Sequence, residues 1–481
     1  MKNRLGAIIS VFVKTTQNEN APSTRKVRRE VLCGKRGAGH RLQMLGRRVW
    51  RPDPGRMRRQ QDDRRLTALA GLVEFGVFCK QQGIDGKLRE CFGDMKRGAG
   101  VVYPMAGQLR LLMDLYVAGE GRVFGLESHA QDPVLRHLAG GFIPSIDVLY
   151  DDLCRFDAQK LSLLHHLMSQ VTLQRLSRSK LERAHVDIDT TVTELFGKQE
   201  GARPGPNPRY HGRPSYHPLL MRVAEVDGVV GAQLRAGDRG FGDDDVPVIK
   251  RWLKSVRDAV GAECELRARM DAAGDCTELL RCFEQQGVHY IVKAKLTTDL
   301  LSALSQHAQW RTVERDAEGK PSRQVATVMF ARQPWSTLQS PVRVIAVRSS
   351  ERETGKQLYL WDGLEYTAQC YITSDWLAPE EQLAAEYNDR AGIEPLIGEL
   401  KGDWRIGKVP TRDFDANHAA FLLKLLAYNL FRAFLATSYP RLSRWRTRWA
   451  RRATILRAGR LCRSGRVTTL RMAPMAFPMR L

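Results

Sequence analysis

Residues 185–195 read H-V-D-I-D-T-T-V-T-E-L, a run in which β-branched residues alternate with polar ones. Alternation with a period of two predicts a β-strand, and it places Asp187 and Asp189 on the same face of that strand. The stretch therefore predicts the first strand of a sheet and, on one face of it, a pair of carboxylates.

The sequence that follows continues the sheet. Residues 216–226 and 229–236 have the same strand character, and Asp227-Gly228 between them is typical of a hairpin turn. Helical and strand patterns then alternate: helix 244–260, strand 263–271, helix 277–286 and strand 288–294. Three strands including a hairpin, followed by helix, strand, helix and strand, is the order of a ribonuclease-H-like sheet.

Other segments flank this sheet, so the fold class we expect is mixed α/β. Residues 61–180 have helical periodicity and predict a helical domain, which we expect to bind DNA. A catalytic domain is expected over 181–440, with a β-rich insertion at about 296–378 and helix from Pro379 to about Phe434. The Arg-rich residues 441–481 are expected to form a C-terminal tail.

Charge is distributed unevenly along the chain, which has 76 Lys and Arg against 53 Asp and Glu, a formal net charge of +23. Residues 1–60 hold 16 basic and 3 acidic side chains, and residues 441–481 hold 12 Arg and no acid. The net charge of residues 61–440 is therefore −2. This balance predicts a nucleic-acid partner, bound largely by the two basic ends. Residues 1–60 read as a disordered arm, and initiation at Met44 or Met57 would leave most of it untranslated.

Cysteine usage and apolar runs argue against other classes of protein. Nine Cys without a C-x-x-C pair disfavour a zinc finger or a disulfide scaffold and favour a reducing compartment. Residues 5–13 resemble a signal-peptide core, but no cleavage site follows them. Residues 418–436 are long and apolar, but Lys424, Asn429 and Arg432 interrupt them, which favours a buried helix. We expect a cytoplasmic protein with no membrane partner.

Carboxylates lie on or next to the strands of the predicted sheet. Asp187 and Asp189 lie on its first strand, Asp271 ends its fourth, and Glu394 lies on the helix after the insertion. Oxygen ligands that converge from neighbouring strands suit Mg²⁺, and a pair of ions can promote phosphodiester chemistry. Taken singly, each has an ordinary structural explanation, such as a cap or a solvated helix face. Asp187 is an alternative metal ligand on the first strand, and Asp275 a weaker alternative to Asp271.

The helix after the insertion carries an aromatic residue, two cations and a carboxylate on one face. Tyr387, Arg390, Glu394 and Lys401 fall within roughly 60° on one helix face at 100° per residue. An exposed face in which Arg390 pairs with Glu394 would explain the same spacing. Alternatively, the carboxylate binds metal and the two cations hold phosphates beside it. Pro395 predicts a bend in the helix after Glu394.

The spacing Y-(2)-R-(3)-E-(6)-K resembles the signature of the DDE transposases of bacterial insertion sequences, the YREK-bearing group. D-I-D-T-T and M-D-A-A-G resemble that group's first and second aspartate motifs, although the second lacks the usual D-S-G-F character. The segments A-G-E-G-R-V-F-G-L-E, F-G-K-Q-E-G-A and F-D-A-N-H-A-A-F-L-L-K-L-L-A-Y-N-L are also similar. The resemblance extends over roughly residues 60–470.

The resemblance implies a cut-and-paste transposase with a ribonuclease-H-like core. Asp189, Asp271 and Glu394 would be the catalytic triad that holds two Mg²⁺ ions, and Mn²⁺ is expected to substitute. Water would nick one strand, and the freed 3′-hydroxyl would attack the other strand to give a hairpin before strand transfer. The substrates would be double-stranded DNA, namely terminal inverted repeats and target DNA. The enzyme would act as a homodimer in a synaptic complex, in the bacterial cytoplasm and associated with the nucleoid.

The same resemblance implies the roles of the neighbouring side chains. Tyr387, Arg390 and Lys401 would contact transposon-end DNA near the scissile phosphate. A tryptophan of the insertion can stack on a flipped base in such enzymes, and the candidates are Trp310, Trp335 and Trp361. Two other functions fit the same residues: a nuclease of this fold without strand transfer, and an inactive DNA-binding copy.

Overall fold

The computed structural model describes residues 63–205, 212–350, 358–361, 364–465 and 467–474. The chain divides into two compact units, Met1–Asp63 and Arg64–Leu481, and the helices and strands below all belong to the second. The basic arm expected over residues 1–60 lies outside the described residues.

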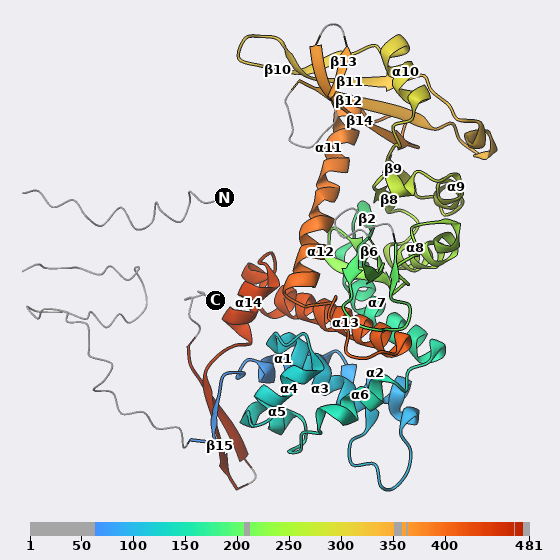
Figure 1. Cartoon of the computed structure of the whole chain (residues 1–481). Coiled ribbons are helices and arrows are strands. Elements are labelled where there is room, and N and C mark those ends of the chain that lie inside the picture. The colour runs from blue at the N-terminus through green and yellow to red at the C-terminus, as the bar shows by residue number, and fades with distance from the viewer. Residues whose placement is uncertain (1–62, 206–211, 351–357, 362–363, 466, 475–481) are drawn as a thin grey trace, which may run out of the picture. The chain divides into compact units, whose positions relative to one another are not determined.

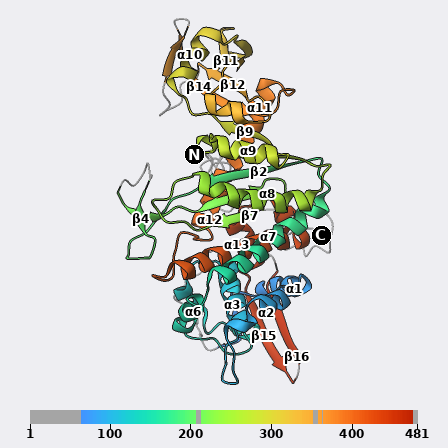
Figure 2. The same ribbon diagram turned by 90° about the vertical axis from the view of Figure 1, so that its right-hand side faces the viewer.

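The centre of the second unit is a mixed sheet, seen in Figures 1 and 2. Its first five strands lie in the order β7-β6-β2-β8-β9, with β2 antiparallel to β6 and parallel to β8. Their bounds are β2 Arg183–Thr190, β6 Leu219–Val223, β7 Gly228–Gln233, β8 Glu265–Met270 and β9 His289–Lys293. This arrangement confirms the predicted mixed α/β class. The predicted hairpin is present, and Asp227 has a positive φ of 46° where the chain turns.

The insertion extends the same sheet. Strand β14 pairs with β9, and the strands continue outward in the order β14-β12-β11-β10, with β13 paired to β14. These strands are β10 Arg311–Arg315, β11 Pro321–Val328, β12 Arg343–Ser349, β13 Leu358–Trp361 and β14 Leu364–Thr373. The insertion also contains a helix that the sequence did not predict, α10 (Thr298–His307), which begins at a Thr297 side-chain cap.

The two faces of the central sheet differ in polarity. One face is apolar, and its core is formed with α7 (Ala158–Ser179), α8 (Val246–Val260) and α9 (Thr277–Gln285). On the other face, Asp187, Arg267 and Arg269 are buried polar residues. Helix α11 (Glu380–Asp389) lies against that second face, so it covers charge as well as apolar surface.

Helices dominate the N-terminal part of this unit: α1 Leu72–Gln81, α2 Ile84–Phe92, α3 Met105–Ala118, α4 Leu126–His129, α5 Pro133–Leu138 and α6 Ile146–Leu153. They share one hydrophobic core with α13 (Phe414–Ser438) rather than forming a core of their own. Helix α13 is long and apolar enough to cross a membrane, but 94% of its most apolar window is buried inside the protein. The prediction of a buried helix over 418–436 is therefore confirmed.

The Arg-rich C-terminal segment is folded through residue 474, which its composition did not predict. It contains α14 (Thr447–Thr454) and a hairpin of β15 (Gly459–Ser464) and β16 (Val467–Met472). Strand β15 also pairs with β1 (Leu66–Thr67), so the two ends of the unit are joined. On α14, the inward Thr447 hydroxyl accepts a 2.9 Å hydrogen bond from Trp404. The segment is thus part of the core.

Candidate functional site

The sheet register brings two of the predicted carboxylates to one edge. Strands β2 and β8 are parallel, and Asp187 lies opposite Arg269. Two residues further along each strand, Asp189 and Asp271 reach the carboxyl ends of β2 and β8 on the same face. Local hydrogen bonds hold both side chains, because Asp189 accepts from the Thr190 amide at 2.8 Å and Asp271 from the Ala273 amide at 3.0 Å.

Glu394 and Arg390 lie at the same edge. Arg390 forms an ion pair with Asp189, with Nη2 3.3 Å from Oδ2. Burial, together with the negative charges of Asp271 and Glu394, raises the pKa of Asp189 to about 6, although Arg390 opposes this shift. The carboxylates of Asp271 and Glu394 therefore act electrostatically on Asp189, and Arg390 acts against them.

The segment that carries these residues is not a single helix. Helix α11 ends at Asp389, a 3₁₀ turn spans Arg390–Gly392, and α12 (Ile393–Gly402) begins after it. Pro395 lies in the first turn of α12, where a missing N–H costs nothing. In a continuous helix, its ring would instead clash with the carbonyl of Ala391. The predicted bend after Glu394 is therefore wrong: the break precedes Glu394, and the four-residue stripe is divided between two helices.

Tyr387 lies at the end of α11 and is almost completely buried. Its ring packs on Tyr371 of β14, with ring centroids 4.5 Å apart. Burial raises the pKa of Tyr387 to about 12, and the charges of Asp271, Asp189 and Glu394 act in the same direction. This side chain is next to the carboxylates, and the neutral phenol is its stable form there.

Arg390 is buried but incompletely bonded. Its guanidinium lies 6.0 Å from the centre of the Tyr387 ring. Among the described residues, its Nε and Nη2 atoms have no hydrogen-bond acceptor, even though Nη2 is close enough to Asp189 for an ion pair. A buried donor without an acceptor carries a free-energy cost, which a phosphate oxygen could remove.

Lys401 is placed differently from Arg390. It lies in the last turn of α12, and its ammonium donates a 2.7 Å hydrogen bond to the carbonyl of Val192. It therefore joins α12 to the loop after β2.

Asp187 does not join the carboxylate cluster. It is fully buried and accepts hydrogen bonds from Arg222 at 2.9 Å and from Arg269 at 2.7 Å. Asp275 is likewise paired, with Arg332 at 2.7 Å and with the Lys295 amide at 2.7 Å. Both alternatives that the sequence left open are thus already held by other parts of the protein, which argues against a metal-ligand role for either.

Residues 53–480 match the family described as "Transposase DDE domain group 1". The chain belongs to this family of DDE transposases. A comparison with curated proteins gave no match. Among solved structures, the chain is similar to the "Cryo-EM structure of piggyBac transposase synaptic complex with hairpin DNA", with 11% sequence identity and a TM-score of 0.41 over 79% of this chain and 78% of that one.

DDE transposases use divalent metal ions, and the donor set at this edge fits them in chemistry. Asp189, Asp271 and Glu394 supply only oxygen atoms, which Mg²⁺ prefers. Within the described residues, however, no group of three His, Cys, Asp or Glu side chains is close enough to hold an ion. Burial, and after it the charges of Asp271 and Glu394, raise the pKa of Asp189, and a divalent cation bound here would favour the ionised carboxylate.

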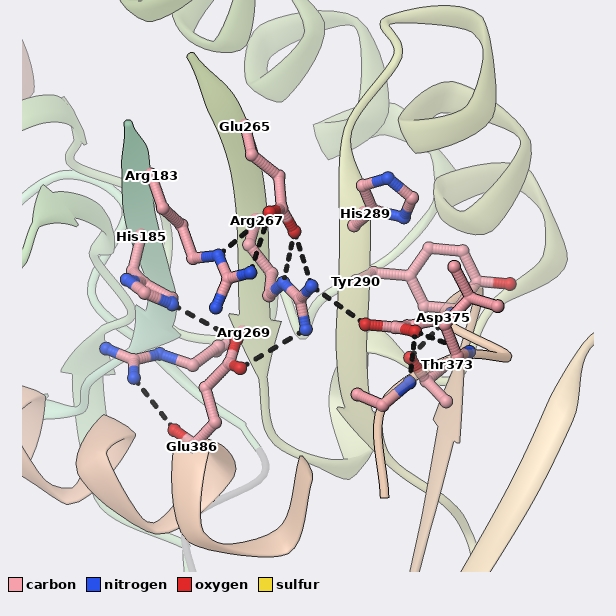
Figure 3. A network of polar contacts seen from close by, with 12 residues as sticks. Arg183, His185, Glu265, Arg267, Arg269, His289, Tyr290, Thr373, Asp375 and Glu386 are labelled. Carbon is pink, nitrogen blue, oxygen red and sulfur yellow. Dashed lines mark hydrogen bonds and ion pairs between the residues drawn. The ribbon is translucent and has the colours of Figure 1, made fainter. Parts of the chain in front are cut away.

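A polar network in this transposase, which the sequence analysis missed, fastens α11 to the sheet. Arg267 of β8 bonds the carboxylates of Glu265, Asp375 and Glu386 (Figure 3). His185 of β2 also contacts Glu386, with its Nε2 3.1 Å from Oε1. Burial alone would lower the pKa of His185, but hydrogen bonds to two glutamates raise it. Glu386 immediately precedes Tyr387, so the network fixes the helix at the site.

The tryptophans predicted to stack on DNA differ in their burial and in their contacts. Trp335 is buried against Phe330, and its ring is covered by a guanidinium, so it is a core residue. Trp310 is stacked with the Arg348 guanidinium 4.4 Å from its ring centre. The side chain of Trp361 lies outside the described residues. Trp376, which follows β14 and was not singled out, is 47% exposed.

Proposed function

We propose that this DDE transposase is a cut-and-paste enzyme of the bacterial insertion-sequence type that bears the YREK signature. The observation that carries the proposal is the convergence of Asp189 and Asp271, from adjacent parallel strands, with Glu394 and the unsatisfied Arg390.

Each residue at this edge has a part in the proposed reaction. Asp189, Asp271 and Glu394 hold the Mg²⁺ ions, which when bound activate a nucleophile and stabilise the leaving oxygen. Arg390 donates to a non-bridging oxygen of the scissile phosphate, since two of its donor atoms lack acceptors. Lys401 contacts the flanking phosphate.

In the proposed reaction sequence, hydrolysis of one strand frees a 3′-hydroxyl at the transposon end. That hydroxyl attacks the opposite strand and forms a hairpin, which is reopened before transfer to target DNA. Two ends are cut within one synaptic complex, so a homodimer is the proposed working unit. The nucleoid of a bacterial cytoplasm is the proposed location of the reaction.

An end-joining assay tests this function directly. The purified chain is incubated with Mg²⁺, a linear DNA carrying the sequence that flanks this reading frame, and a supercoiled plasmid. We expect hairpin ends, seen as double-length strands on a denaturing gel, and plasmids joined to the donor DNA. Cleavage without joining would instead identify a nuclease of this fold, and the absence of any Mg²⁺-dependent product would identify a non-catalytic DNA-binding copy.

DNA affinity is proposed to come in part from the outer face of α14 and the turn before it. Arg444, Arg448 and Arg452 are exposed there, and no carboxylate among the described residues pairs with them. Arg448 and Arg452 both stack on Trp449, with distances of 4.5 and 4.9 Å to its ring centre. Cations arranged around an exposed aromatic ring suit a nucleic-acid backbone.

Changing these three arginines to glutamine is expected to weaken DNA binding and to reduce its salt dependence. Each lost phosphate contact lowers the slope of log K against log salt by about 0.9, so the triple variant should lose up to about 2.7. Fluorescence anisotropy of a labelled duplex over a salt series measures the slope. The control is Arg251→Gln with Lys254→Gln on α8, two exposed cations on another surface. An unchanged slope in the triple variant would mean that α14 does not touch DNA. Deleting the whole segment is not a usable test, because it removes part of the core.

A further inference from the structure

A cleft of about 420 Å³ is lined by residues outside the carboxylate cluster. It is lined by α3, the 3₁₀ turn Val123–Gly125, the chain that follows β3 (Thr193–Glu194), the loop between α12 and α13, and Lys424 of α13. Its volume is within the range of small-ligand sites. None of the functional roles proposed above uses it.

Cations outnumber carboxylates in the lining of the cleft, where Arg122, Lys408 and Lys424 are accompanied by Glu194. Lys424 is fully buried at its base and donates hydrogen bonds to the carbonyls of Arg405 at 2.9 Å and of Lys408 at 2.7 Å. Burial and the nearby charges of Arg122, Arg405 and Lys408 lower the pKa of Lys424 to about 7. Glu194 is the carboxylate in the lining, and it is already paired with Arg213. An anionic ligand would be stabilised here.

The rim of the cleft is aromatic. Phe124 is 60% exposed and Phe196 is 82% exposed, although both are large apolar side chains. Gln199 also lines the cleft, and its buried Oε1 has no hydrogen-bond partner among the described residues. Exposed aromatic rings, an unpaired amide acceptor and a surplus of cations together match a nucleotide, which has a flat base and a phosphate.

Two chain segments connect the cleft to the carboxylate cluster. One runs from Asp189 along the loop after β2 to Phe196, and the other from Glu394 through α12 to Lys408. The Lys401–Val192 hydrogen bond joins these two segments between the cluster and the cleft. A DNA strand whose phosphodiester lies at the cluster would therefore reach the cleft by following α12 and the loop after β2.

We propose that this cleft binds one unpaired nucleotide of the DNA end, with the base against Phe124 and Phe196 and the phosphate at Arg122 and Lys408. The inference rests on the proposed function, because it takes the DNA strand at the carboxylate cluster as its starting point. The site is separate from the insertion tryptophans and holds the strand on the side of the helical domain.

The test compares two DNA probes in buffer with EDTA, so that binding is measured without cleavage. One probe is a blunt mixed-sequence duplex, and the other is the same duplex with a single unpaired thymidine at its end. The full chain should bind the second probe about 10-fold more tightly, because stacking of one base on aromatic side chains is equivalent to about 1.4 kcal/mol. The double variant Phe124→Ala/Phe196→Ala should lose this preference and keep its affinity for the blunt duplex.

Two controls make the outcome decisive. Phe142→Ala removes an equally exposed phenylalanine (71% exposed) that does not line the cleft, and it should keep the preference. A probe with an abasic unpaired residue should bind like the blunt duplex, and an equal gain with it would overturn base stacking. The wild-type chain binding both original probes equally would overturn the proposal. Cleavage in Mg²⁺ is scored separately, so a chain that prefers the unpaired nucleotide but never cleaves would refute only the proposed function.

Discussion

Replacing Asp189 with Asn is expected to lower the rate of DNA end cleavage by at least about 10³-fold and to leave DNA binding intact. A metal ion supplies several kcal/mol of transition-state stabilisation, and about 4 kcal/mol corresponds to that factor. Asp271→Asn and Glu394→Gln should have the same effect, since in the proposed function all three carboxylates hold the metal ions. Single-turnover cleavage of a labelled DNA end, with binding measured by anisotropy, separates the two quantities.

Asp389→Asn is the matched control, because this exposed carboxylate directly precedes Arg390 at the same helix end. A surface substitution should change the rate by no more than about 2-fold, equivalent to about 0.5 kcal/mol. Full activity in any one of the three carboxylate variants would remove that residue from the catalytic set.

The stability of Asp189→Asn gives an independent readout. The pKa of Asp189 rises from 3.8 to about 6 on folding, so the folded chain binds more protons than the unfolded chain between these values. The free energy of unfolding contributed by this group therefore falls as the pH rises through that window. Asparagine does not titrate, so the variant lacks this decrease in the free energy of unfolding. It should therefore be at least as stable as the wild-type chain at pH 7. A loss of stability at pH 7 would mean that the Asp189–Arg390 pair outweighs the burial of the carboxylate and its repulsion by Asp271 and Glu394.

The sheet could be predicted from the sequence because alternating residues mark its strands and an Asp-Gly pair marks its hairpin turn. The alternation in 185–195 and Asp227-Gly228 between two strand-like runs predicted the first strand and the hairpin, and the patterns that follow predicted β8 and β9 along the chain. The approach of Asp189 to Asp271 then followed from parallel pairing. The contact of either residue with Glu394 depends on how α11 and α12 pack, which no local pattern specifies.

The structural features that the sequence did not predict depend on contacts between residues that are far apart in the chain. The Arg-rich segment after residue 441 reads as solvated, yet Arg446 pairs with Asp403 at 2.7 Å and the Thr447 amide bonds Glu399 at 3.1 Å. Likewise, the cations that neutralise Asp187 come from β6 and β8. The composition gives the number of these charged residues but not which of them form ion pairs.

Asp187 and Asp189 are two residues apart on one strand face, yet the structure gives them opposite surroundings. Asp187 receives two guanidinium groups, and each of these also bonds a backbone carbonyl in the segment that carries the site. Arg222 donates to the Gly392 carbonyl at 2.9 Å, and Arg269 donates to the Glu386 carbonyl at 2.8 Å. A side chain at position 392 would collide with Arg222, whose Nη2 would lie 2.6 Å from an added Cβ. We therefore expect Asp187 to position the site through these two arginines.

Asp187→Ala is expected to lower the free energy of unfolding by about 3–5 kcal/mol, because it leaves two buried cations without their shared partner. Urea denaturation of the full chain, followed by fluorescence and by circular dichroism, measures the loss. Asp238→Asn breaks an exposed ion pair with Arg203 and should cost no more than about 1 kcal/mol. Cleavage should fall in Asp187→Ala as well, since the 3₁₀ turn bearing Arg390 loses its anchor. If Asp187→Ala were as stable as the wild-type chain and still failed to cleave, Asp187 would belong with the metal ligands, and the distinction between the two aspartates would be wrong.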